Sequence, residues 1–502
     1  NKAGNLTGSS ISKYTYQHDA LNRRTSRVQQ GTAFTQATFD TFNYNDRGEV
    51  IESKRYTGTD VTDKSNPLAP VAFGYEYDPV GNRISSQIGT NPQRDYTTTA
   101  LNQYSEIHHP SLILHPSFDA DGNLTDSGTG WHYKWDAENR LIKAQNYQFT
   151  PDTGSKRLYF IYDYQSRRVA KIVEEWNGAI WVETSDHRYL YDGWNLIFEI
   201  SNLPSAIETT KSFLWGLDLS QTIQGAGGVG GLLSVTEHAG THQGTYVYTY
   251  DANGNLGQVL NSTGATVAHY EYDPFGELIS FSGVKADDFT FRFSTKYLDF
   301  ETGLYYYGYR YFSPETGRWL SRDPIAEAGG LNLYVFVGNN AIWFIDAHGE
   351  FGFIGAAIGA VSGGVGGFIA GSSAGGLSGA LKGAVIGTAV GASVGLVAPQ
   401  ASGVLAGAVV GAAIGGTSSV AGQVAGGLVN NQTMSQSIAN VDLGAVAGAT
   451  VGGAAGGAWS AANTLVNGIG LSNQLAGAFG DGFITGVGEF VGYFLGDIIF
   501  CK

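Results

Sequence analysis

The sequence holds only one cysteine, Cys501, and one methionine, Met434, among 502 residues. A single thiol excludes a framework of disulfides within the chain. Positive charge is also scarce, because 29 Lys and Arg residues stand against 44 Asp and Glu residues, which gives a formal net charge of −15 and a pI near 5.0. This balance argues against a nucleic-acid partner, since proteins that bind nucleic acids usually present a basic face.

The first ten residues, NKAGNLTGSS, contain neither an initiating methionine nor the basic and apolar regions of a signal peptide. We therefore expect the sequence to be a fragment or the end of a longer chain, with a delivery region upstream of it. The length exceeds that of one ordinary domain, so two or more domains are expected.

A short motif recurs through the first two thirds of the chain. Its shared form is aromatic-x-aromatic-Asp, two residues, Gly or Glu, Asn, then Arg or Leu and an apolar residue, as in YEYDPVGNRIS from Tyr75, YKWDAENRLIKA from Tyr133 and YTYDANGNLGQ from Tyr248. Aromatics at i and i+2 lie on one face of a strand, and Asp, Gly and Asn supply a turn, so each copy predicts a β-hairpin. Binding of Ca²⁺ by the turn aspartates is disfavoured, because one Asp per copy supplies too few oxygen ligands.

These copies resemble the YD-repeat, or Rhs, family, which includes the teneurins and the C components of insecticidal Tc toxins. The resemblance covers about residues 1–349 and is most specific over 296–340, KYLDFETGLYYYGYRYFSPETGRWLSRDPIAEAGGLNLYVFVGNN, which is similar to the core segment of that family. It implies a mainly β fold, in which a spiral sheet of hairpins forms part of a hollow shell and the core closes one end. We therefore assign 1–295 to the repeat shell, 296–349 to the core and plug, and 350–502 to a separate C-terminal domain.

The resemblance also implies a site of self-cleavage, because shells of this family that carry toxins often cut their own chain just after the core. The cut is attributed to two aspartates that act as in an aspartic protease, and the matching positions here are Asp323, in Arg322-Asp323-Pro324, and Asp346. One carboxylate would activate water while the other, protonated, polarises the scissile carbonyl. Arg322 could orient one of the carboxylates or lower its pKa.

The expected cut lies near Glu350–Phe351, but the sequence departs from the family pattern at three positions. Ala341 and Ala347 stand where proline is usual, and Glu350 stands where leucine is usual. The alternative, in which both aspartates only cap turns of the plug and His348 is a turn residue, therefore stays open.

Residues 351–502 differ sharply in composition from everything before them. They contain 38 of the 72 glycines, no His and no Arg, with Val, Ile, Leu, Phe and Ala in between. Without these groups no nucleophile–base pair, metal site or phosphate-binding loop can be assembled, so an enzymatic C-terminal domain and any cofactor are disfavoured.

The glycines of this region recur every fourth residue, a spacing that belongs to one face of a helix. The longest unbroken series has eleven glycines, from Gly355 to Gly395. So many glycines would heavily destabilise helices in water, whereas small residues let helices pack closely inside a membrane. The pattern predicts an all-α glycine-rich domain with helices near 352–371, 376–397, 402–429, 441–467 and 475–499, most of them about long enough to cross a bilayer. The candidate packing positions are Gly355, Gly359, Gly363, Gly367, Gly371, Gly375, Gly379, Gly383, Gly387, Gly391, Gly395, Gly403, Gly407, Gly411 and Gly415.

The sequence thus favours the C-terminal part of an Rhs-type toxin, in which a YD-repeat shell carries a pore-forming or membrane-inserting domain. The expected partners are a target membrane, an upstream delivery region and an immunity protein. A surface-displayed adhesion repeat protein, with the hydrophobic region as its membrane anchor, is the alternative.

Overall fold

The computed structural model describes residues 10–202, 209–239 and 243–350. The chain divides into two units, and the first is formed by Asn1–Pro324 and Leu331–Glu350. Of the second unit the structure describes only Ile325–Gly330, and everything below concerns the first. The helices and packing glycines predicted beyond residue 350 lie outside the described residues.

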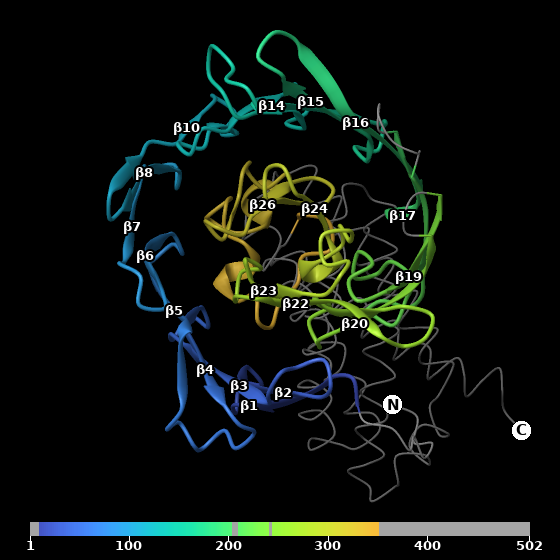
Figure 1. The fold of residues 1–502 in the computed structure, drawn as a ribbon. Helices are drawn as coiled ribbons and strands as arrows, with labels where there is room; N and C mark the ends of the chain where they lie inside the picture. Colours follow the sequence, from blue (N-terminus) through green and yellow to red (C-terminus); the bar gives the residue numbers. More distant parts are fainter. Residues whose placement is uncertain (1–9, 203–208, 240–242, 351–502) are drawn as a thin grey trace, which may run out of the picture. The chain divides into compact units, whose positions relative to one another are not determined.

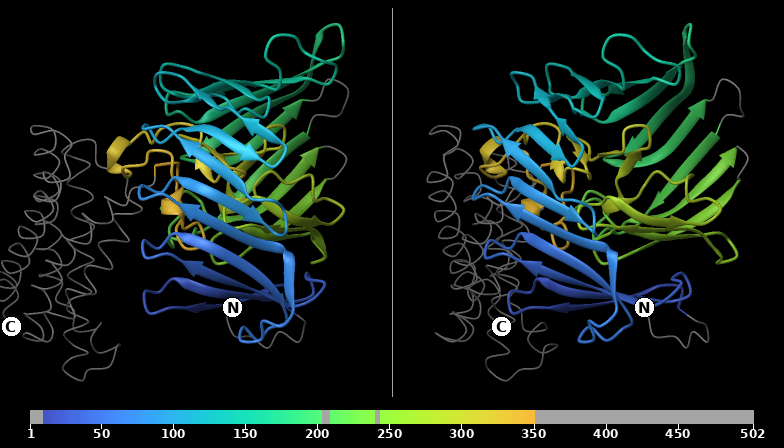
Figure 2. Two further views of the ribbon diagram at one scale, coloured as in Figure 1. Left: turned by 90° about the vertical axis from the view of Figure 1, so that its left-hand side faces the viewer. Right: turned by 60° about the vertical axis from the view of Figure 1, so that its left-hand side comes forward.

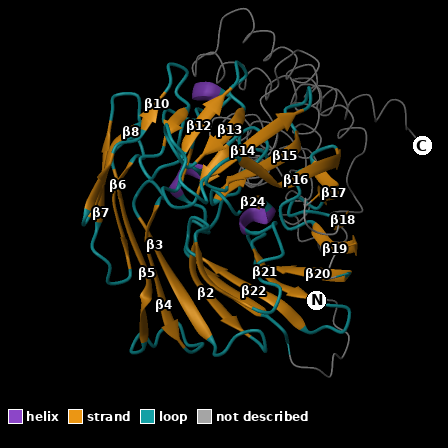
Figure 3. Ribbon diagram, turned by 45° about the horizontal axis from the view of Figure 1, so that its top comes forward, coloured by secondary structure: helices purple, strands orange, loops and turns teal. Residues whose placement is uncertain are grey.

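The first unit is built almost entirely from antiparallel β-strands, as the motif copies predict (Figure 3). Nine strands form the first sheet: β1 (Lys13–His18), β2 (Arg24–Gln30), β3 (Thr38–Tyr44), β4 (Val50–Thr57), β5 (Pro67–Tyr77), β6 (Arg83–Ile88), β7 (Arg94–Thr98), β8 (Tyr104–His109) and β9 (Leu112–Leu114). Each strand pairs with the next one in the chain, and Figure 2 shows them in blue, one after another from the bottom of the view upward.

The second sheet continues this meander with fourteen strands. They are β10 (Ser117–Phe118), β11 (Leu124–Asp126), β12 (His132–Trp135), β13 (Leu141–Gln145), β14 (Lys156–Tyr162), β15 (Arg168–Trp176), β16 (Trp181–Asp192), β17 (Asn195–Asn202), β18 (Thr209–Trp215), β19 (Leu232–Ala239), β20 (Gly244–Tyr250), β21 (Leu256–Leu260), β22 (Thr266–Tyr272) and β23 (Leu278–Ser282). The hydrogen-bonded ladder is interrupted between β9 and β10.

The third sheet is small and lies inside the arc that the two larger sheets trace (Figure 1). Its strands are β24 (Tyr297–Asp299), β25 (Leu304–Tyr306), β26 (Tyr311–Ser313) and β27 (Arg318–Trp319), and the short 3₁₀ turns of this unit are η1 (Phe293–Thr295) and η3 (Val337–Asn339). The turn η2 (Ala326–Ala328) belongs to the second unit. These strands lie within residues 296–349, the segment that the sequence assigns to the core and plug, and we call this segment the core below.

The turn aspartate of each motif copy organises its hairpin. The Asp78 Oδ1 accepts the backbone N–H groups of Val80 at 3.0 Å and Asn82 at 2.8 Å, and Gly81 takes the positive φ that the turn requires. Asp136 accepts the N–H groups at the same two offsets. These carboxylates cap their turns, so the recurring position of Asp in the motif has a structural role.

The two motif aromatics point inward, as their i, i+2 spacing predicts. Tyr75 is buried, whereas Glu76 between Tyr75 and Tyr77 is exposed. In the copy that starts at Tyr248, Tyr248 is likewise buried and Tyr250 is half-buried. The interior of the arc is therefore lined with aromatic rings.

Buried cations tie the core to these inward faces. Arg168 on β15 pairs with Asp299 on β24 at 2.6 Å, and neither side chain is more than 1% exposed. The same guanidinium lies over the rings of Tyr297 and Tyr306. Hydrogen bonds from the core to turn carbonyls, such as Tyr334 Oη to Gly122 O at 2.8 Å, add further ties.

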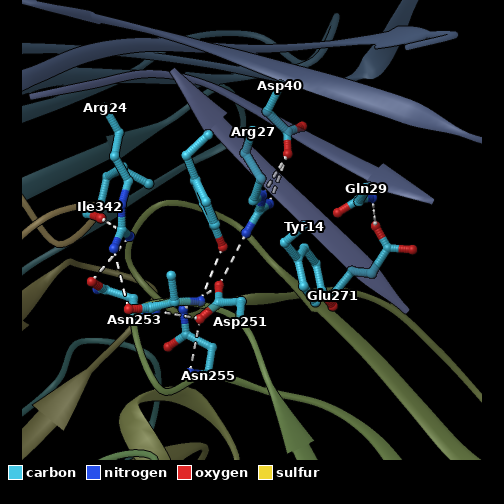
Figure 4. A network of polar contacts seen from close by, with 12 residues as sticks. Tyr14, Arg24, Arg27, Gln29, Asp40, Asp251, Asn253, Asn255, Glu271 and Ile342 are labelled. Carbon is cyan, nitrogen blue, oxygen red and sulfur yellow. Dashed lines mark hydrogen bonds and ion pairs between the residues drawn. The ribbon is translucent and has the colours of Figure 1, made fainter. Parts of the chain in front are cut away.

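The start of the first sheet meets the end of the second through side chains, at a contact we call the seam (Figure 4). Asp40 on β3 pairs with both Arg27 on β2 and Arg55 on β4, and these arginines face Asp251, at the end of β20, and Glu271 on β22. Arg27 pairs with Asp251 at 3.2 Å, and Arg55 pairs with Glu271. Gln29 also donates a hydrogen bond to Glu271 at 2.9 Å.

The seam predicts an acid-sensitive contribution to stability. Burial alone would raise the pKa of the Glu271 carboxyl, but the hydrogen bond from His269 and the charge of Arg55 outweigh it and hold the pKa at about 2, below the ordinary 4.5. A depressed carboxyl pKa stabilises the fold fully above the ordinary value, and this stabilisation is lost as the pH falls from about 4.5 to about 2. We expect Glu271→Gln to lower the free energy of unfolding by about 2 kcal/mol at pH 7.

Urea unfolding of the full chain at pH 7, 4 and 3 measures this effect. The difference in the free energy of unfolding between wild type and Glu271→Gln should become smaller at each lower pH. The exposed Glu183 on β16 provides the matched control, and Glu183→Gln should change little at any pH. A gap that stays constant from pH 7 to pH 3 would contradict the role of the seam.

Candidate functional site

The two aspartates singled out from the sequence, 23 positions apart, come together at one buried guanidinium, that of Arg310. The Arg310 Nη2 lies 2.7 Å from Asp323 Oδ2 and 3.5 Å from Asp346 Oδ2. All three side chains are buried, Arg310 to within 1% of full burial. Arg310 comes just before β26 and Asp323 follows β27, so the small central sheet positions both groups.

Asp346 folds the end of the described chain around its own carboxylate. Its Oδ1 accepts the backbone N–H groups of His348 at 3.1 Å, Gly349 at 2.7 Å and Glu350 at 3.0 Å. Gly349 has a φ of +87°, a conformation that favours glycine. The tight turn therefore brings Glu350 next to the aspartate pair.

Three successive carbonyls of this turn are held by the body of the unit. Lys296 Nζ donates to Ala347 O at 2.6 Å, the Tyr309 N–H donates to His348 O at 3.0 Å, and Arg310 Nε donates to Gly349 O at 2.5 Å. The segment that leads to Glu350 is thus fixed in place by one backbone and two side-chain donors.

Burial shifts the pKa of several groups around the turn. It raises the pKa of the Glu350 carboxyl to about 7, and the charges of Asp346 and Asp323 reinforce the shift. It lowers the pKa of the Lys296 ammonium to about 8. It also lowers the pKa of His348 to about 3, with help from Lys296, so this imidazole is neutral at pH 7.

The arrangement brings two carboxyl groups to one buried guanidinium. Arg310 contacts both Asp323 and Asp346, and the buried Lys296 ammonium interacts with the charge of Asp346 as well. Two neighbouring carboxyl groups are the side chains on which an aspartic mechanism is built.

Reasoning from the sequence named Arg322 as the partner of the carboxylates and did not name Arg310. In the structure Arg322 is half-buried beside Gly122, and the cation in contact with both aspartates is Arg310. A signal was present, because Arg310 interrupts the aromatic run YYYGYRYF, and a cation in a buried segment needs a carboxylate partner. His348 packs against the ring of Trp194, with centroids 5.1 Å apart.

Two further properties concern only the part of the chain that the structure describes. No group of three or more His, Cys, Asp or Glu residues there is arranged to hold a metal ion. None of the helices found within residues 10–350 is both long enough and apolar enough to span a membrane.

Removal of the shared guanidinium predicts a large loss of stability. Arg310→Met leaves two buried carboxyl groups without this cation, which should cost about 3–5 kcal/mol in the free energy of unfolding. Arg322→Met, the matched control, should cost much less. The measurement is urea unfolding at pH 7.

The origin of the loss can be tested in the same assay. Adding Asp323→Asn and Asp346→Asn to Arg310→Met removes the two negative charges that Arg310 contacts and should recover part of the stability. Equal losses for Arg310→Met and Arg322→Met would contradict the assignment of Arg310 as the shared partner.

Comparison with known proteins places these features in a family context. The model of the Teneurin YD-shell family matches residues 229–342. The chain is 29% identical over 288 residues to the tRNA3(Ser)-specific nuclease WapA of Bacillus spizizenii, which covers 55% of this chain and 11% of that protein. It is also 29% identical over 299 residues to the toxin subunit YenC1 of Yersinia entomophaga, which covers 55% of this chain and 28% of that protein.

Among solved structures, the crystal structure of TcdB2-TccC3 matches 67% of this chain and 19% of that chain, with a TM-score of 0.48 and 20% identity. The matched part of the chain spans about a tenth of the length of WapA and about a quarter of the length of YenC1.

Proposed function

The chain belongs to the YD-repeat, or Rhs, family, and from this premise we propose that it is the C-terminal part of an Rhs-type polymorphic toxin. In this proposal the YD-repeat unit is part of a shell that carries a membrane-active domain, residues 351–502. The protein is secreted or displayed at the cell surface. Its partners are a target membrane, an upstream delivery region and an immunity protein.

The observation that carries the proposal is where the folded β-unit ends in the sequence. The fixed turn around Asp346 leads to Glu350, and the glycine-rich sequence with its four-residue spacing starts immediately afterwards. A scaffold that holds the chain so firmly just before an apolar segment is suited to present that segment as cargo. The absence of His and Arg from 351–502 supports a membrane-active cargo over a nuclease such as the WapA relative.

Self-cleavage between Glu350 and Phe351 is the second part of the proposal. One carboxylate of the pair takes a proton from water, and the resulting hydroxide adds to the Glu350 carbonyl, which accepts a hydrogen bond from the other, protonated carboxyl group. Collapse of the tetrahedral intermediate breaks the C–N bond, and the nitrogen of Phe351 takes up a proton. The products are a new carboxyl group at Glu350 and a new amino group at Phe351.

The competing function is a surface adhesion protein whose hydrophobic region serves as an anchor. The exposed repeat surface would then carry the activity, and residues 351–502 would bind membranes without disrupting them. Leakage of vesicles separates the two possibilities.

The proposed cleavage predicts two fragments from the purified full chain. Intact mass should reveal a fragment that begins at Phe351, and Asp323→Asn and Asp346→Asn should each abolish it, because neither variant retains two carboxyl groups. The exposed Asp121 provides the matched control, and Asp121→Asn should cut like wild type. Wild-type protein that stays in one piece would refute the cleavage proposal.

The proposed membrane activity predicts release of a trapped dye from anionic phospholipid vesicles. The full chain should release it, whereas a chain that ends at Glu350 should not, because it lacks the glycine-rich region. Binding to vesicles without release would favour the anchor. If the full chain neither binds the vesicles nor releases the dye, both functions are excluded for this region.

A further inference from the structure

A cavity of about 320 Å³ lies inside the first unit, between the two large sheets and the core. Three further cavities in the described residues are much smaller, at about 50, 20 and 10 Å³. Sites that bind small molecules usually range from about 300 to 1,000 Å³. The cavity therefore has the size of a ligand site, and it is separate from the aspartate pair.

The fold explains why the cavity exists at this place. It lies where the ladder is interrupted between β9 and β10, and the strands next to the interruption are only two or three residues long. Side chains from β7 to β12 line one side, and residues between Thr302 and Tyr334 of the core line the other. The short strands bring too few side chains to fill the space between the sheets and the core.

Aromatic rings make up much of the lining, and this favours a flat, apolar ligand body. The rings belong to Tyr96, Tyr104, Phe118, Trp131, Tyr133, Trp319 and Tyr334. Such rings offer stacked or edge contacts to another ring.

The polar groups of the lining favour an acceptor on that ligand. Arg318 Nη1 and Trp319 Nε1 are buried and lack an acceptor within the described residues, and the Tyr104 hydroxyl, which lies beside the Arg318 guanidinium, also has no acceptor there. All three atoms can donate a hydrogen bond. Leaving buried donors unpaired is costly, so a bound acceptor would stabilise the protein.

The charge balance points to an anionic acceptor. Arg94, at the partly exposed edge of the cavity, already pairs with Glu315 at 3.5 Å. Arg318 makes no ion pair within the part of the chain described here, and its Nη2 is occupied by the amide oxygens of Asn82 and Asn332 and the backbone carbonyl of Asn102. The Nη1 side of this buried cation is left for a ligand.

We propose that this cavity binds a small aromatic carboxylate. The ring of the ligand packs among the aromatic side chains, and its carboxylate accepts hydrogen bonds from Arg318 and from the Tyr104 hydroxyl beside it. A charge-assisted hydrogen bond to a guanidinium is stronger than one between neutral groups, so the carboxylate should distinguish this ligand from neutral molecules of the same shape.

The test uses 2-naphthoate as the probe and 2-naphthamide as its uncharged counterpart, with the full chain and equilibrium dialysis. We expect one naphthoate per chain and at least tenfold weaker binding of the amide. Thr316, a half-buried cavity residue, offers a way to fill the space. Thr316→Trp should weaken naphthoate binding at least tenfold, whereas Thr266→Trp, at an exposed position on β22, should not.

Each outcome has a definite meaning. Loss of binding in Thr316→Trp alone, with an unchanged unfolding midpoint, supports the site. Equal binding to wild type and Thr316→Trp would place the probe elsewhere and overturn the proposal. Absence of naphthoate binding would also overturn the proposal, and so would binding of 2-naphthamide as strong as that of 2-naphthoate. The comparison of these two probes needs only the wild-type chain.

Discussion

Buried ion pairs between the sheets and the core hold the described unit together. A ring of inward-facing aromatics provides apolar surface, but it does not determine where a small central sheet should sit. The pair of Arg168 with Asp299 does so, because a fully buried charge has only a few positions in which it is compensated. Arg318 adds a second fixed point through its hydrogen bonds to Asn82 and Asn102. The candidate site depends on this placement, since Arg310 and Asp323 both belong to the core so positioned.

The sequence predicted the local structure well, because each motif copy contains the information for its own hairpin. The aromatics of Tyr75 and Tyr77, the cap by Asp78 and the positive φ at Gly81 all follow from residues within seven positions. The mainly β fold was therefore predictable without knowledge of distant contacts. The predicted all-α region beyond residue 350 stays a prediction.

The contacts that define the candidate site were only partly predictable. The family resemblance pointed to Asp323 and Asp346. The aromatic run around Arg310 signals that this cation needs a carboxylate partner, but it does not show which carboxylates, or that there are two of them. The seam and the cavity were missed for the same reason. Arg27 and Asp251 are 224 positions apart, and no local pattern links two such residues. Asp251 also caps its own turn, so its second role in an ion pair was hidden behind the first.

The sequential strand order also affects how the unit forms. Each strand of the two large sheets pairs with its chain neighbour, and pairings of low sequence separation form early in folding and can form while a chain is still being synthesised. The core comes last in this unit and makes its ties to residues more than a hundred positions earlier, as Arg168 and Asp299 do. Asp323 and Asp346 follow every strand of the two large sheets in the chain, so they are synthesised after all of those strands. The chain order therefore makes the aspartate pair one of the last parts of this unit that can be assembled.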